Sequence, residues 1–72
     1  MSPDQLGVLA LKDKELLNSV NSKVLDMAKR DNKKTLTLTD IQLYLLEIAQ
    51  VLPRDLQRIL YQLVNQELKK LK

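Results

Sequence analysis

The chain lacks cysteine, histidine, phenylalanine and tryptophan altogether, and it has a single glycine among its 72 residues. The absence of cysteine excludes disulfides. Without cysteine and histidine the usual protein ligands of zinc, haem and copper are also missing. One glycine, Gly7, cannot build a phosphate-cradling loop, because such loops need glycines at several fixed positions. We therefore expect no metal and no cofactor.

The same absences argue against catalysis. Histidine is the commonest general base and cysteine the strongest common nucleophile, and neither is present. Serine occurs only at positions 2, 19 and 22, none of them in a strained nucleophile turn. The carboxylates are scattered and form no close pair of the kind that glycosidases use. The sequence thus predicts a protein that is not an enzyme and has no small-molecule substrate.

The chain does contain abundant aliphatic residues. Apolar types make up 32 of the 72 residues, and 17 of these are leucine, which is enough for one folded domain over 1–72. The net charge of +3 is compatible with nucleic-acid binding but does not require it. No apolar run approaches the roughly 20 residues of a membrane span, and no signal-peptide pattern opens the chain. We expect a cytoplasmic protein without a membrane partner.

The first segment reads as a helix over about 3–31. Ser2 and Gln5 form a capping box, and cations and Asn32 mark the far end. Asp13 interrupts the apolar stripe, which favours a break near 12–13 and therefore four helical pieces; the alternative is a continuous helix with a buried functional carboxylate. The stripe consists of Leu6, Leu9, Ala10, Leu16, Leu17, Val20, Val24, Met27 and Ala28.

Residues 34–38 lie in a run of alternating Thr and Leu, the only strand-like pattern in the chain. A lone short strand is not stable, so this extended segment is either a linker or pairs with another chain. A second helix is expected over 40–51, with Thr39 and Gln42 as its capping box. One apolar face of that helix comprises Ile41, Tyr44, Leu45, Ile48, Ala49 and Leu52.

The second helix also carries apolar residues on its opposite side. Leu43 and Leu46 lie there beside Glu47 and Gln50. A helix that is apolar on two sides is usually sandwiched between neighbours, so it is either central in its own bundle or meets a partner. These four residues are our candidate protein interface, and we expect the chain to dimerise or to bind another protein.

Pro53 ends the second helix and opens a third, expected over 53–71. The fold class that follows is all-α, a small bundle of three helices, or of four if the first segment breaks. The apolar face of the third helix consists of Leu56, Ile59, Leu60, Leu63, Val64, Leu68 and Leu71.

Basic residues gather at the link after the first segment and along the third helix. Arginine and lysine bind phosphates, while Gln62 and Asn65 are types that form bidentate contacts with base edges. The plainer interpretation is a solvated surface, since every soluble helix needs a polar face. The candidate nucleic-acid residues are Lys33, Lys34, Thr35, Thr37, Arg54, Arg58 and Lys69.

The run Lys-Lys-Thr-Leu-Thr-Leu-Thr at 33–39, followed by a helix, a tight turn and a second helix, resembles the ribbon–helix–helix DNA-binding family over residues 33–71. The resemblance implies that two chains pair their strands into a ribbon that enters the major groove. It would direct Thr35, Thr37 and Thr39 toward DNA and Leu36 and Leu38 toward the core. A helix-turn-helix is another route to DNA.

Two functional hypotheses follow. The first is a non-catalytic helical module for protein–protein interaction or regulation, which associates with itself. The second is a DNA-binding transcriptional regulator of the ribbon–helix–helix or helix-turn-helix type.

Overall fold

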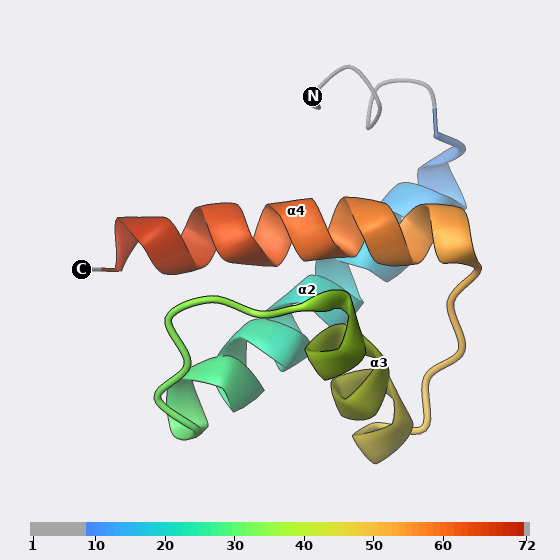
Figure 1. Cartoon of the computed structure of the whole chain (residues 1–72). Helices are drawn as coiled ribbons and strands as arrows, with labels where there is room; N and C mark the ends of the chain where they lie inside the picture. Colours follow the sequence, from blue (N-terminus) through green and yellow to red (C-terminus); the bar gives the residue numbers. More distant parts are fainter. Residues whose placement is uncertain (1–8, 72) are drawn as a thin grey trace.

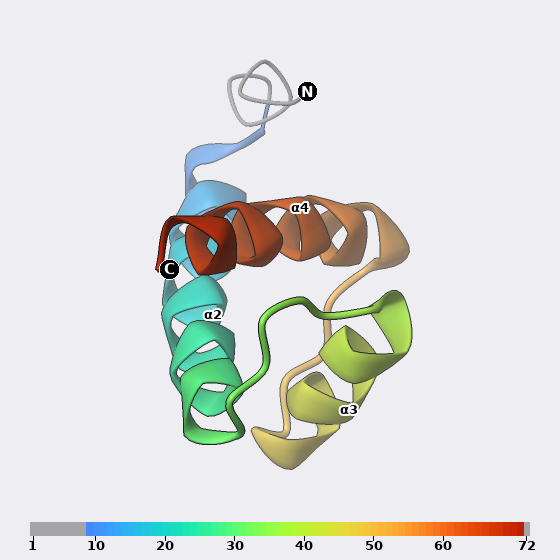
Figure 2. The same ribbon diagram turned by 60° about the vertical axis from the view of Figure 1, so that its left-hand side comes forward.

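The computed structural model describes residues 9–71, which form three α-helices around one apolar core. Helix α2 spans Leu11–Arg30, α3 spans Leu38–Glu47 and α4 spans Arg54–Lys70. Helix α4 packs across both α2 and α3 (Figures 1 and 2). The expected all-α three-helix class is confirmed for this part of the chain. The predicted Ser2–Gln5 capping box lies outside the described residues.

Helix α2 begins just before the predicted break near 12–13. Ala10 is its N-cap, with extended backbone angles and no side-chain capping bond. Asp13 does not cap the helix; it lies in the first turn, where a carboxylate is favoured by the helix dipole. From Leu11 the helix is continuous to Arg30, so residues 11–30 form one helical piece.

The end of α2 is a left-handed turn at Asn32, whose φ is 58°. The Lys33 N–H donates to the Ala28 carbonyl at 2.9 Å, and the Asn32 N–H donates to the Lys29 carbonyl at 3.1 Å. This pair of bonds is the Schellman arrangement that satisfies the last carbonyls of a helix. Asparagine tolerates the left-handed conformation better than most residues, which explains why the helix ends here.

Residues 34–37 form a loop, and Leu38 already belongs to α3. No strand occurs anywhere between residues 9 and 71. Leu36 is only 1% exposed and joins the core, whereas Leu38 is 40% exposed. The loop passes from α2 to α3 along the side of α4 (Figure 2). Within this single chain the Thr–Leu alternation therefore produces an extended connection that inserts one leucine.

The N-cap of α3 is Thr37, two residues before the Thr39 that we expected. The Thr37 hydroxyl accepts from the Asp40 N–H at 3.1 Å, and the Asp40 carboxylate accepts from the Thr37 N–H at 3.0 Å. These reciprocal bonds make a capping box. The sequence holds two overlapping Thr-x-x-polar patterns, Thr37 to Asp40 and Thr39 to Gln42, and the helix begins at the earlier one.

Replacing Thr37 with Ala should lower the free energy of unfolding by about 1 kcal/mol, because α3 loses its N-cap acceptor. The matched substitution Thr39→Ala should change it by less than about 0.5 kcal/mol, since Thr39 is exposed within the first turn. Urea unfolding followed by circular dichroism measures both. A larger loss at Thr39 would show that the helix begins there instead.

Helix α3 ends at Glu47, four residues earlier than predicted. Ala49 has a φ of 54°, and the Gln50 N–H donates to the Leu45 carbonyl at 2.9 Å, so a second Schellman turn closes this helix. Alanine in this conformation costs about 1 kcal/mol or more, because its Cβ crowds the next carbonyl. The early turn lets the linker return to the bundle, where Leu52 is buried.

Helix α4 follows Pro53 directly. It starts one residue later and ends one residue earlier than the predicted range of 53–71. The Gln57 side chain donates to the Leu52 carbonyl at 2.8 Å, which ties the linker to the first turn. The core combines residues from all three helices with one leucine from each loop. Its members are Leu17, Val20, Val24, Met27, Ala28, Leu36, Ile41, Tyr44, Leu45, Leu52, Leu56, Leu60, Val64 and Leu68.

Candidate functional site

Two surface features stand out on the described residues, an apolar pair on α3 and a basic groove. The apolar pair, Leu43 and Leu46, lies on the side of α3 away from the core residues Ile41, Tyr44 and Leu45. Leu43 is 58% exposed and Leu46 is 76% exposed. Their spacing of three places them next to each other on the helix. We call this pair the α3 outer face.

A polar cluster borders the α3 outer face. The Arg30 guanidinium at the end of α2 donates to Glu47 Oε2 at 2.9 Å and to Asp31 Oδ1 at 3.0 Å. The buried Tyr44 hydroxyl donates to Asp31 Oδ2 at 2.6 Å. Glu47 therefore has a structural partner within the chain, and the cluster ties the end of α2 to α3.

The cluster shifts the ionisation of its members. Hydrogen bonds from Arg30, and then from Tyr44, lower the pKa of the Asp31 carboxyl to about 2. Partial burial and the hydrogen bond to Asp31 raise the pKa of Tyr44 to about 12. The bonds to Asp31 and Glu47 raise the pKa of Arg30 further above its usual value. Arg30 and Asp31 are thereby held in their charged forms, and Arg30 also pairs with Glu47.

Gln50, the fourth residue of the predicted interface, does not continue the α3 outer face. It lies beyond the end of α3, after the left-handed Ala49, and its side-chain amide donates to the Val51 carbonyl at 3.3 Å. Val51 is 85% exposed in the linker to α4. Sequence periodicity missed this exposed valine, because we expected the helix to include it.

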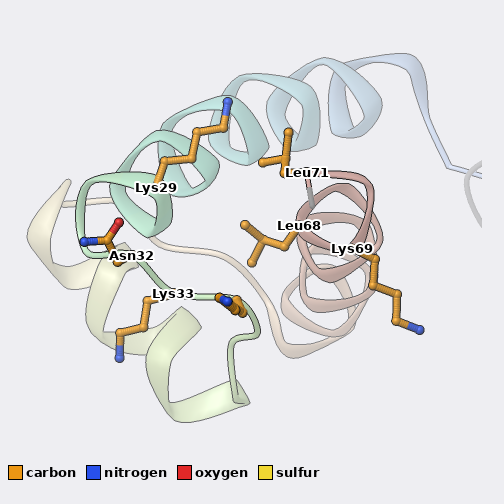
Figure 3. A pocket seen from close by; sticks show the side chains of 7 residues that line it. Lys29, Asn32, Lys33, Leu68, Lys69 and Leu71 are labelled. Atoms are coloured by element: carbon orange, nitrogen blue, oxygen red, sulfur yellow. The ribbon is translucent and has the colours of Figure 1, made fainter.

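The basic groove lies where the C-terminal ends of α2 and α4 meet the α2–α3 loop (Figure 3). Its volume is about 830 Å³. Leu68 projects from α4 toward the loop with Leu71 beside it, and the side chains of Lys29, Lys33 and Lys69 extend outward from the rim. No acidic residue lines it. The groove is formed by Lys29, Asn32, Lys33, Lys34, Leu68, Lys69 and Leu71.

The fold gathers only part of the predicted nucleic-acid set. Lys33, Lys34 and Lys69 all line the groove, although Lys69 is distant in sequence from the other two. Arg54 begins the opposite end of α4, about 22 Å from Lys69 at 1.5 Å per residue. Arg58 lies one turn further along the helix, so both arginines belong to another surface.

The side chains of Thr35 and Thr37 form hydrogen bonds within the same chain. The Thr35 hydroxyl donates to Asn65 Oδ1 at 3.3 Å, and Thr37 caps α3. The capping bond from the Thr37 N–H also lowers the pKa of Asp40. Lys33 lies 3.8 Å from an Asp40 carboxylate oxygen. Both threonines therefore help to hold the loop and α3 in place.

Asn65 does make a bidentate contact, but with the backbone of Leu36. The Leu36 N–H donates to Asn65 Oδ1 at 2.8 Å, and Asn65 Nδ2 donates to the Leu36 carbonyl at 3.0 Å. This pair satisfies both backbone groups of a residue whose side chain is buried in the core. We call this contact the Asn65 clamp. Nothing in the local sequence indicates it.

Residues 9–71 contain neither an acidic cluster for a metal ion nor a membrane-spanning helix. No three or more acidic residues lie close enough together to hold a metal ion, and the chain has no histidine or cysteine to add. None of the three helices is both long enough and apolar enough to cross a membrane.

Comparison with known proteins adds no relative. No protein-family model matches the chain, no curated protein matches it, and no solved structure matches its fold.

Proposed function

We propose that this protein is a non-catalytic helical module for protein–protein interaction, and that it associates with itself through the α3 outer face. The observation that supports this most is the exposure of two neighbouring leucines, Leu43 and Leu46, on a helix whose other side is fully used by the core. Exposed apolar patches of this kind typically mark interaction surfaces.

The surroundings of the α3 outer face suit a symmetric contact. A two-fold interface places the same patch on both partners, so each patch must complement itself. Around Leu43 and Leu46 lie uncharged residues such as Thr39 and Gln42, while Glu47 is paired with Arg30. The uncharged residues beside the two leucines therefore allow two copies to approach at this face.

Simple energetics set the expected strength of the association. Covering the exposed parts of Leu43 and Leu46 in two copies contributes about 4–8 kcal/mol before costs. Association costs about 4–15 kcal/mol, so little remains from these leucines alone. At most about 4 kcal/mol remains, so we expect a dissociation constant of about 1 mM.

DNA binding is the alternative proposal, and two observations bear on the choice. Thr35 and Asn65 bond to each other, and Thr37 caps α3, so three polar residues suited to contacting DNA have partners inside the chain. Arg54 and Arg58 are exposed, and no ion pair holds either of them within the described part of the chain. These two arginines are what favours the alternative, as a phosphate-binding pair on α4.

The double variant Leu43→Glu/Leu46→Glu should be monomeric at every concentration, because like charges replace the apolar contact. Sedimentation equilibrium between about 20 µM and 1 mM should show the parent as a monomer at the low end and partly dimeric at the high end. The variant should unfold within about 1 kcal/mol of the parent, since both side chains are exposed.

Leu11→Glu is the matched control. Leu11 is 71% exposed, but it begins α2, about 28 Å along that helix from the end that contacts α3. This variant should dimerise as the parent does. If the parent stays monomeric at 1 mM, or if Leu11→Glu and the double variant lose association equally, the α3 outer face is not the interface.

A further inference from the structure

The basic groove concentrates positive charge beyond what the helix ends require. Lys29 and Lys69 lie in the last turns of α2 and α4, where the helix dipole favours cations. The helix dipole does not explain Lys33 and Lys34, because these residues belong to the loop. Asp40 pairs with Lys33, whereas Lys29, Lys34 and Lys69 have no ion-pair partner among residues 9–71.

The groove is also apolar at its centre. Leu68 is buried and Leu71 is 51% exposed, and the lysines stand at the rim around them with their side chains directed outward (Figure 3). A ligand that fills the groove can therefore cover the exposed half of Leu71 while its charges meet ammonium groups at the edge. Helix-in-groove recognition combines apolar anchors and charged borders in the same way.

The residue types distinguish between two kinds of anionic partner. Phosphate backbones are commonly bound by arginine, whose planar fork matches their oxygens, and single-stranded bases stack on aromatic rings. The groove contains neither arginine nor an aromatic residue. The lysine ammonium is a compact point charge that pairs well with a single carboxylate, and contact between leucine and an apolar side chain is favourable.

We propose that the basic groove binds an acidic amphipathic segment of a partner protein, with carboxylates at Lys29, Lys34 and Lys69 and an apolar side chain on Leu68 and Leu71. This inference rests on the proposed role in protein–protein interaction and adds the chemistry of a partner. It uses a surface distinct from the α3 outer face, so the two can be tested separately.

The test uses the full chain and a fluorescent 14-residue peptide with glutamate and leucine at helical spacing. Fluorescence anisotropy should show saturable binding that weakens as salt increases. The variant Lys29→Glu/Lys34→Glu/Lys69→Glu should bind at least about tenfold more weakly, because three attractions become repulsions. Leu71→Ser should weaken binding about fivefold through lost apolar contact. If the glutamate variant does not fold by circular dichroism, Lys→Gln at the same positions replaces it.

A matched control changes the same charge elsewhere. Lys12, Lys23 and Arg58 are exposed and do not line the groove, so replacing all three with Glu alters the net charge equally. This control should keep most of the affinity. Equal loss in both triple variants would overturn the proposal, because binding would follow net charge alone.

Two further probes decide what the groove accepts. A peptide with serine in place of leucine should bind at least about fivefold more weakly, because it cannot use Leu71. A 14-base-pair DNA duplex should not compete for the groove at physiological salt. Any of three results would overturn the assignment: the first peptide fails to bind, the serine peptide binds equally well, or DNA binds more tightly through the groove lysines. None of these results depends on dimerisation through Leu43 and Leu46.

Discussion

Replacing Leu36 with Ala should lower the free energy of unfolding by about 2–5 kcal/mol, the range for deleting a fully buried leucine. Leu36 is 1% exposed and packs in the core although it lies in a loop. The same substitution at Leu38, which is 40% exposed, should cost only about 1 kcal/mol. Thermal or urea unfolding at several protein concentrations compares the two.

This pair of variants also separates two arrangements of the Thr–Leu run. In a two-chain ribbon, Leu36 and Leu38 would share one face and both would be covered, because alternate strand residues point the same way. Equal losses of unfolding free energy at the two positions, in a protein whose stability falls on dilution, would support the ribbon. A large loss at Leu36 alone would support the loop of the single chain.

The second large effect concerns the Asn65 clamp. Asn65→Ala should destabilise the protein by about 2–3 kcal/mol, because the Leu36 N–H and carbonyl both lose their partner in a half-buried setting. The stability of Asn65→Asp should lie between that of Asn65→Ala and that of the parent, since aspartate keeps the acceptor and loses the donor. Urea unfolding monitored by circular dichroism measures all three proteins.

Gln62→Ala is the matched control for the Asn65 clamp. Gln62 is exposed on the same helix, and its removal should change stability by less than about 0.5 kcal/mol. If Asn65→Ala were as mild as Gln62→Ala, the clamp would contribute nothing to stability. Asn65 would then be free to act at the surface, as the nucleic-acid hypothesis supposed.

Local sequence predicted the helices well where apolar periodicity was long. Most of the stripe from Leu16 to Ala28 and most of the face from Leu56 to Leu68 became core, because burial of a periodic face is the main force that stabilises a helix in a protein. Leu16 and Ile59 only pack against this core, and Leu63 does not join it. The outward placement of Leu43 and Leu46 also followed from periodicity, since residues at these angles cannot join Ile41, Tyr44 and Leu45.

The boundaries of α3 were predicted less well. Thr37 and Thr39 both begin a plausible capping pattern, and the sequence within four residues does not choose between them. Its other end depends on Ala49, a residue with no intrinsic preference for positive φ. That conformation persists because the chain must turn back to bury Leu52, a requirement set by the whole bundle.

By itself, then, the sequence determined that the chain is helical, which faces of its helices are apolar, and that histidine and cysteine chemistry is absent. Only the tertiary structure decided that Asn65 holds Leu36 and that Lys69 joins Lys29 and Lys34 at one groove. The physical reason is distance along the chain. Periodicity and capping act within about one or two helical turns, whereas these contacts join segments that meet only when α4 packs across the bundle.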